Sequence, residues 1–167
     1  MKKYCIDTSG LSNPLESMPQ DIHSSMWVRV FDILGNGSVA VTREIFDEMV
    51  HIDGGVGDFI KDNAKNLVLE VGEAGWDSVS YISCSTKMIA DHHDFISEYI
   101  GGSRKTVCLA DISIVALAKS LNVPVVSMEK RVGLLAKGKR KIPDICDIEG
   151  VRHMDFSDLL RAENFKN

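Results

Sequence analysis

The sequence has no long hydrophobic run and no cysteine pair with metal-binding spacing. No apolar stretch approaches the ~18 residues of a membrane-spanning helix, and Asp7 interrupts the short apolar start. We therefore expect no membrane span and no secretory signal. The four cysteines, Cys5, Cys84, Cys108 and Cys146, form no CxxC pair, which argues against a zinc ribbon or a redox motif. These absences predict a cytoplasmic protein with reduced thiols.

The sequence also lacks the glycine motifs that bind phosphates and dinucleotides. There is no GxxxxGK[ST] segment, and the glycines at 54, 55 and 57 neither complete GxGxxG nor directly follow an expected strand. Basic residues are not in excess, since 19 Lys and Arg against 24 Asp and Glu give a formal net charge of -5. A global electrostatic attraction for nucleic acid is excluded, so any such binding must come from a local basic patch.

The chain does have the length and composition of one globular domain. It has 167 residues, of which 44% are hydrophobic and 26% are charged. Both fractions are close to the averages for folded proteins. We therefore expect a single domain over residues 1–167.

Short β-type runs alternate with helical patterns along the chain. We expect strands over 3–6, 38–42, 67–71, 123–127 and 151–154, and helices over 21–34, 43–52, 85–100, 106–121 and, as a closing turn, 158–163. The helix over 106–121 has the clearest pattern, because its apolar residues recur at steps of three and four. This alternation predicts an α/β fold whose central, mostly parallel sheet is covered by helices on both faces.

Acidic residues gather beyond the carboxyl ends of the expected strands, where ligands bind in such sheets. Asp7 directly follows the first strand, Glu48 lies on the helix after the second, and Glu129 follows the fourth. Asp111 lies on the apolar side of a helix, where an unpaired carboxylate is costly. Converging carboxylates need a cation, and an all-oxygen ligand set suits Mg²⁺ or Mn²⁺. The residues therefore point to metal-dependent phosphodiester hydrolysis.

Each acid also has an ordinary explanation when it is taken alone. Asp7 is placed as a helix cap would be, and Glu129 heads a charged turn typical of solvent-exposed loops. The second acid has two candidates, because Glu44 and Glu48 are four residues apart and share one helix face. We favour Glu48, which Met49 follows as an apolar neighbour, and keep Glu44 as the alternative.

Four segments, in this order and spacing, resemble the PIN-like domain. This family is a metal-dependent nuclease fold that many prokaryotic toxin–antitoxin ribonucleases use. The segments are YCIDTS at 4–9, TREIFDEM at 42–49, LADISIVALA at 109–118 and PVVSME at 124–129. The tail beyond residue 141 is similar to a less-characterised PIN-like subgroup. The resemblance implies a three-layer α/β/α fold and an acidic Mg²⁺ or Mn²⁺ site.

On this interpretation four acids hold one or two divalent ions and cleave RNA. The catalytic and metal-binding residues would be Asp7, Glu48, Asp111 and Glu129. Two hydroxyl residues next to these acids would support the carboxylates by hydrogen bonding, and these are Thr8 and Ser127. The enzyme would be a metal-dependent endoribonuclease and the toxin of a toxin–antitoxin pair, with RNA as its substrate, an antitoxin protein as a partner and a homodimer as its assembly.

A basic segment follows the fourth acid. Residues 137–141 carry four positive charges, on Lys137, Lys139, Arg140 and Lys141. We expect this segment to hold a phosphate backbone, and its alternative is a solvated surface loop.

A second hypothesis is a non-catalytic module that keeps the same fold and binds a protein or RNA partner. It is favoured by Glu129, where the family often has Asp, and by the open choice of the second acid. Binding that EDTA leaves unchanged would distinguish the module from the nuclease.

Overall fold

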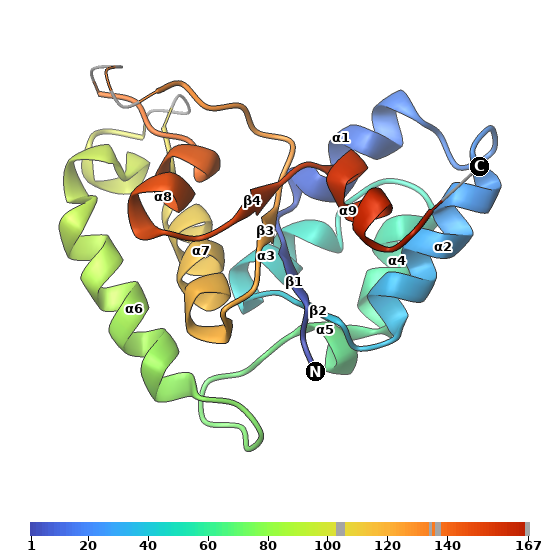
Figure 1. Ribbon diagram of the computed structural model, residues 1–167, viewed down its shortest axis with the longest axis horizontal. Helices are drawn as coiled ribbons and strands as arrows, with labels where there is room; N and C mark the ends of the chain where they lie inside the picture. The colour runs from blue at the N-terminus through green and yellow to red at the C-terminus, as the bar shows by residue number, and fades with distance from the viewer. Residues whose placement is uncertain (103–105, 134, 136–137, 166–167) are drawn as a thin grey trace.

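A parallel sheet lies between two groups of helices (Figure 1). The computed structural model describes residues 1–102, 106–133, 135 and 138–165. In Figure 1, helices α6, α7 and α8 lie on one side of the strands, and α1, α2, α4 and α9 lie on the other. The structure therefore confirms the α/β class and the α/β/α layers.

The sheet is built from short strands in the order β2-β1-β3-β4, all parallel. They are β1 (Tyr4–Ile6), β2 (Val39–Ala40), β3 (Val125–Val126) and β4 (His153–Met154). Cys5 of β1 lies opposite Ala40 on one side and opposite Val125 on the other. From β1 the chain passes first to β2 on one side and later to β3 on the other side. The carboxyl ends of β1 and β3 therefore form a topological switch point, which is where α/β sheets bind ligands.

Helices fill the connections between the strands. After β1 come α1 (Ser9–Ser17) and α2 (Ser24–Gly35), and after β2 come α3 (Arg43–Met49), α4 (Gly55–Asp62), α5 (Ala64–Leu67), α6 (Ser78–Asp91), the 3-10 turns η1 (His93–Phe95) and η2 (Ser97–Tyr99), and α7 (Leu109–Leu121). Then α8 (Ile142–Glu149) follows β3, and α9 (Phe156–Ala162) follows β4. Within the described ranges, no helix has both the length and the apolar character needed to cross a bilayer.

Two expected elements differ from the structure. The strand expected over 67–71 is reduced to a single bridge between Val68 and Val41, because the run turns outward and Val71 is 55% exposed. The helix expected over 85–100 begins earlier, at Ser78, and ends at Asp91. Its start is fixed by Asp77, whose side chain accepts the Ser80 N–H at 2.9 Å.

Within the described residues, the structure also contains four α-helices that the sequence interpretation did not include, namely α1, α4, α5 and α8. Helix α8 has the ordinary boundary signals, with Pro143 in its first turn and Gly150 at its end with φ +68. Helix α1 contains Pro14, which disfavours a helix interior, yet the helix is continuous from Ser9 to Ser17.

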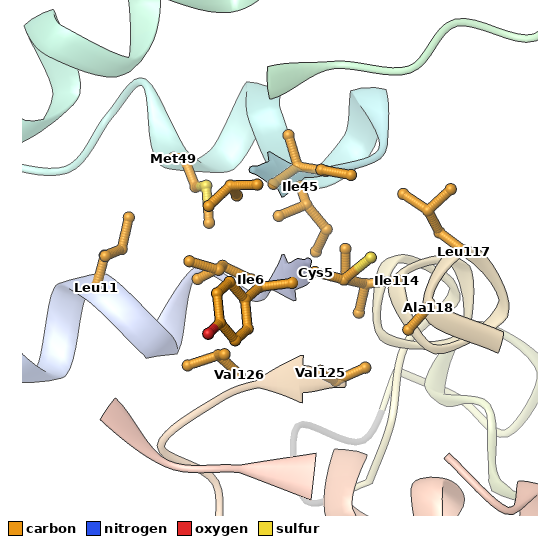
Figure 2. Close-up of a cluster of buried hydrophobic side chains, with 14 of the residues drawn as sticks. Cys5, Ile6, Leu11, Ile45, Met49, Ile114, Leu117, Ala118, Val125 and Val126 are labelled. Carbon is orange, nitrogen blue, oxygen red and sulfur yellow. The ribbon is translucent and has the colours of Figure 1, made fainter. Parts of the chain in front are cut away.

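The core lies on both faces of β1 and β3. Figure 2 shows Ile6 near Leu11 and Met49 on one face, and Cys5 near Ile114 of α7 on the other. Each of these side chains is at most 1% exposed. Neighbouring residues of a strand point to opposite faces, so this packing fixes the register of β1. The chain therefore delivers Asp7 to the carboxyl end of the sheet in a defined place.

Candidate functional site

Asp7 stands at the switch point between β1 and β3. Its backbone N–H donates to the Val126 carbonyl at 2.9 Å, and the residue is only 5% exposed. Carboxylate Oδ2 accepts hydrogen bonds from the Ser9 N–H at 3.0 Å and from the Ser9 hydroxyl at 2.6 Å. Burial raises the pKa of Asp7, and the negative charges of Glu129 and Glu48 also raise it. The hydrogen bonds from Ser9 lower the pKa but do not cancel this effect. The first expected acid is therefore a carboxylate whose ionised form is disfavoured.

Glu48 reaches the same place from α3, which begins directly after β2. The Thr8 hydroxyl donates to Glu48 Oε2 at 2.8 Å, so the turn after β1 contacts this helix. Glu44, one turn earlier, lies on the side of α3 that faces residue 70. Its negative charge raises the pKa of Tyr81 and of Arg43. Of the two candidates for the second acid, Glu48 is therefore the one placed beside Asp7.

Asp111 lies in the first turn of α7. Its Oδ2 accepts the Cys108 N–H at 2.8 Å, which closes the helix N-terminus as a cap. Burial, together with the charges of Asp7 and Glu129, raises the pKa of Asp111 to about 7 despite the hydrogen bond from Cys108. The costly position expected from the sequence is thus observed, together with a structural role in capping.

Glu129 faces the start of α8. Its Oε1 accepts a hydrogen bond from the Lys141 ammonium at 2.7 Å, and its Oε2 accepts the Ile142 N–H at 2.9 Å. Its negative charge nevertheless raises the pKa of both Asp7 and Asp111. The fourth acid therefore belongs to the same electrostatic neighbourhood, although both of its oxygens already have donors.

The four expected acids form a neighbourhood rather than a closed metal cage. Each carboxylate has a donor close to it in the fold, and these donors are Ser9, Thr8, Cys108 and, for the fourth acid, Lys141 with Ile142. Among the residues that the structure describes, no three or more His, Cys, Asp and Glu side chains are grouped closely enough to hold a metal ion. Side-chain movements would be needed to bring the acids onto one ion.

The two expected supporting hydroxyls have different outcomes. Thr8 donates to Glu48, as its role requires. The expectation for Ser127 needs correction, because this residue is 0% exposed and its hydroxyl lies 2.9 Å from His153 Nε2 instead of beside a carboxylate.

Ser9 takes the supporting role that the sequence interpretation missed. Its hydroxyl donates to Asp7 and accepts the Met128 N–H at 3.1 Å, which ties the acid to the segment after β3. A serine two residues after an aspartate is a turn pattern that could have revealed this contact.

The expected basic patch is divided in the structure. Lys137 lies outside the described residues, and Lys139 is exposed. The Arg140 guanidinium lies over the Phe95 ring, 4.3 Å from its centroid, whereas Lys141 turns into the acidic neighbourhood. Of the described basic residues in this segment, Lys141 is the one directly linked to the acids.

Two hollows flank the acids at the carboxyl edge of the sheet. One has a volume of about 510 Å³ and is lined by Thr8, Ser12, Leu15, Glu16, Pro19, Glu48, His51, Ile52 and Asp53. The other has a volume of about 300 Å³ and is lined by Met128, Glu129, Lys130, Arg131, His153, Asp155 and Asp158. Glu48 lines the first hollow and Glu129 lines the second.

Comparison with known families identifies one match. The model of the family described as "Domain of unknown function (DUF4411)" matches residues 4–167, which include the sheet and all four acids. No curated protein matches the chain. The family description assigns no activity, so a function has to be argued from the site.

Proposed function

We propose that this chain, which belongs to the DUF4411 family, is a metal-dependent endoribonuclease. The observation that carries the proposal is the pair of Asp7 and Asp111. These carboxylates come from different elements beside the switch point of a parallel sheet. Burial raises the pKa of both carboxyl groups, and the charge of Asp7 contributes to the raised pKa of Asp111. A divalent cation would relieve that repulsion, and the resemblance to the PIN-like domain points to the same residues.

The donor set fits a hard divalent ion. Asp7, Glu48 and Asp111 offer only carboxylate oxygens, which suit Mg²⁺ or Mn²⁺. Such an ion would supply an activated water and stabilise the negative charge that develops on the phosphate. Ser9 and Thr8 would hold the carboxylates of Asp7 and Glu48 in place.

The reaction would be hydrolysis of an RNA phosphodiester. A water oxygen bonds to phosphorus, the bond from phosphorus to one ribose oxygen breaks, and that ribose oxygen ends with a proton. One fragment then ends in a phosphate and the other in a hydroxyl. The two hollows on either side of the acids would accommodate the strand on each side of the cut.

A cleavage assay tests this function. Purified protein is incubated with total cellular RNA in Mn²⁺, in Mg²⁺ and in EDTA, beside Asp111→Asn and the exposed control Glu73→Gln. We expect discrete fragments with metal for the wild type and the control, and none with EDTA or for Asp111→Asn. Full metal binding and full cleavage by Asp111→Asn would show that the assignment is wrong.

A non-catalytic binding module is the second candidate. It is favoured by the finding that each of the four acids already has a hydrogen-bond donor in the fold. Such a module would bind RNA or a protein partner equally well in EDTA and with Asp111→Asn. Within the nuclease proposal, an antitoxin protein and a second copy of the chain are the proposed partners, and light scattering of the purified protein measures the latter.

A further inference from the structure

Lys141 places a fixed positive charge inside the acidic neighbourhood. Its ammonium lies 2.7 Å from Glu129 Oε1, and its side chain is 26% exposed. The charge of Asp111 also acts on this ammonium. One lysine therefore contacts Glu129 and carries its charge near Asp111, two of the four acids that the nuclease proposal invokes.

The backbone at Lys141 is held by a buried aspartate. Asp144 is 1% exposed, and its Oδ2 accepts the Lys141 N–H at 2.9 Å. The same carboxylate accepts the N–H groups of Val132 at 3.2 Å and Gly133 at 2.9 Å. The carboxylate of Asp144 thus holds two separate parts of the connection between β3 and α8, residues 132–133 and residue 141. The ammonium is therefore brought to the acids by the fold and not by a chance surface contact.

Glu129 is already fully engaged by the segment that carries Lys141. One of its oxygens accepts from the ammonium and the other accepts from the Ile142 N–H. In two-metal sites the ions lie about 3.5–4 Å apart and share carboxylates. A second ion between Asp111 and Glu129 would have to displace the ammonium from Glu129.

We propose that Lys141 takes the place of a second metal ion, so that the site binds one divalent cation and Lys141 contacts the phosphate of the RNA. This inference rests on the proposed nuclease function and specifies its mechanism. The ion is held by Asp7, Glu48 and Asp111, while Glu129 positions the lysine. An ammonium has three donors, so the bond to Glu129 leaves donors for a phosphate oxygen. A compact point charge of this kind is a common phosphate ligand.

The first experiment counts metal ions by isothermal titration calorimetry with Mn²⁺. The wild type is compared with Lys141→Met and with the double variant Lys141→Met/Glu129→Gln, which removes both partners so that neither charge is left unpaired. We expect one Mn²⁺ per wild-type chain. Two ions per chain would overturn the inference and leave the nuclease proposal intact, whereas no bound Mn²⁺ would overturn both.

The second experiment measures binding of a short single-stranded RNA in EDTA, where cleavage does not occur. The double variant should bind at least about tenfold more weakly than the wild type. Lys61→Met is the matched control, because it removes the same charge from an exposed position on α4, and it should change binding by less than about threefold. Lys141→Arg, which keeps the charge, should restore most of the affinity. Equal losses in the double variant and in Lys61→Met would show that Lys141 is not a phosphate ligand.

Discussion

The Thr8 hydroxyl donates a hydrogen bond of 2.8 Å to Glu48 Oε2. This bond joins the turn after β1 to α3, two segments that follow neighbouring strands of the sheet. It distinguishes Glu48 from Glu44, which shares a helix face with it in the sequence but acts on Tyr81 in the structure. The two glutamates therefore provide a matched pair of variants at one helix.

We expect Glu48→Gln to weaken Mn²⁺ binding on the order of tenfold or more, because it removes a proposed ligand charge. Glu44→Gln removes the same charge one turn away and should change the affinity by less than about threefold. Isothermal titration calorimetry measures both. The opposite order would make Glu44 the second acid.

A close contact of the helix that follows Asp7 gives a test of the fold at the site. A Cβ added to Gly10 of α1 would lie 2.9 Å from the Val126 carbonyl oxygen and 3.0 Å from Ile6 Cγ2. Neither neighbour is the end of a flexible side chain, so α1 has to move away from β3. We expect Gly10→Ala to lower the free energy of unfolding by ~1–3 kcal/mol.

Gly55→Ala is the control for Gly10→Ala in urea denaturation. At Gly55 the nearest heavy atom is the side-chain Oε1 of Gln20 at 3.5 Å, which can move aside. This variant should be neutral or slightly stabilising, because alanine favours helix more than glycine does. If both variants unfold at the same urea concentration, α1 is not packed on β3 as described.

The positions of the acids were predictable, but apart from Thr8 their hydrogen-bond partners were not. Asp7 and Glu129 follow strand-forming runs, and Asp111 lies on an apolar helix face, so local pattern was enough to place them near one edge of the sheet. The contact of Ser9 with Met128 joins residues 119 positions apart, and it depends on the packing of α1 against β3. Local pattern carries no such information.

The limits of local sequence pattern also explain why some helices were predicted and others were missed. Helix α7 has a long apolar repeat and was predicted almost to its boundaries, whereas α8 is only eight residues long and its pattern was too short to recognise. Because α8 was missed, the contact of Lys141 with Glu129 was missed with it. The basic segment was therefore predicted as a surface for phosphate, without its link to the fourth acid.

A buried contact between a histidine and a glutamate joins the end of α6 to α8 on one side of the sheet. His92 Nε2 lies 2.8 Å from Glu149 Oε1, and their side chains are 5% and 7% exposed. The Lys119 ammonium lies 2.7 Å from the other oxygen of Glu149. Glu149→Ala leaves the imidazole and the ammonium without their acceptor, so we expect a loss of ~2–4 kcal/mol in the free energy of unfolding.

Asp147→Ala is the matched comparison on the same helix. Asp147 pairs with Arg131 at 2.6 Å, but the two side chains are 45% and 52% exposed. An exposed pair contributes about 0–1 kcal/mol, so this variant should change stability little. Urea denaturation of both variants at neutral pH measures the difference. Similar losses would mean that the buried pair contributes no more than an exposed one.

The elevated pKa of Asp111 predicts an unusual pH dependence in the metal-free protein. Burial raises this pKa to about 7, whereas an aspartate in an unfolded chain titrates near about 4. Between these values the folded state holds a proton that the unfolded state releases. The contribution of Asp111 to the free energy of unfolding is therefore most favourable below about pH 4 and is lost as the pH rises to about 7. This is the reverse of the behaviour of a salt-bridged aspartate.

Asp111→Asn removes this titration while it keeps an oxygen that can accept the Cys108 N–H. In EDTA at pH 8 we expect the variant to be more stable than the wild type by ~2 kcal/mol or more, and the difference should shrink towards pH 4. Glu73→Gln, at an exposed turn, should follow the wild type throughout. Added Mn²⁺ should reverse the order, because the ion stabilises the ionised wild-type site and not the amide. Urea denaturation from pH 5 to pH 8 measures these curves, and a constant difference between variant and wild type would remove the electrostatic basis of the proposed metal site.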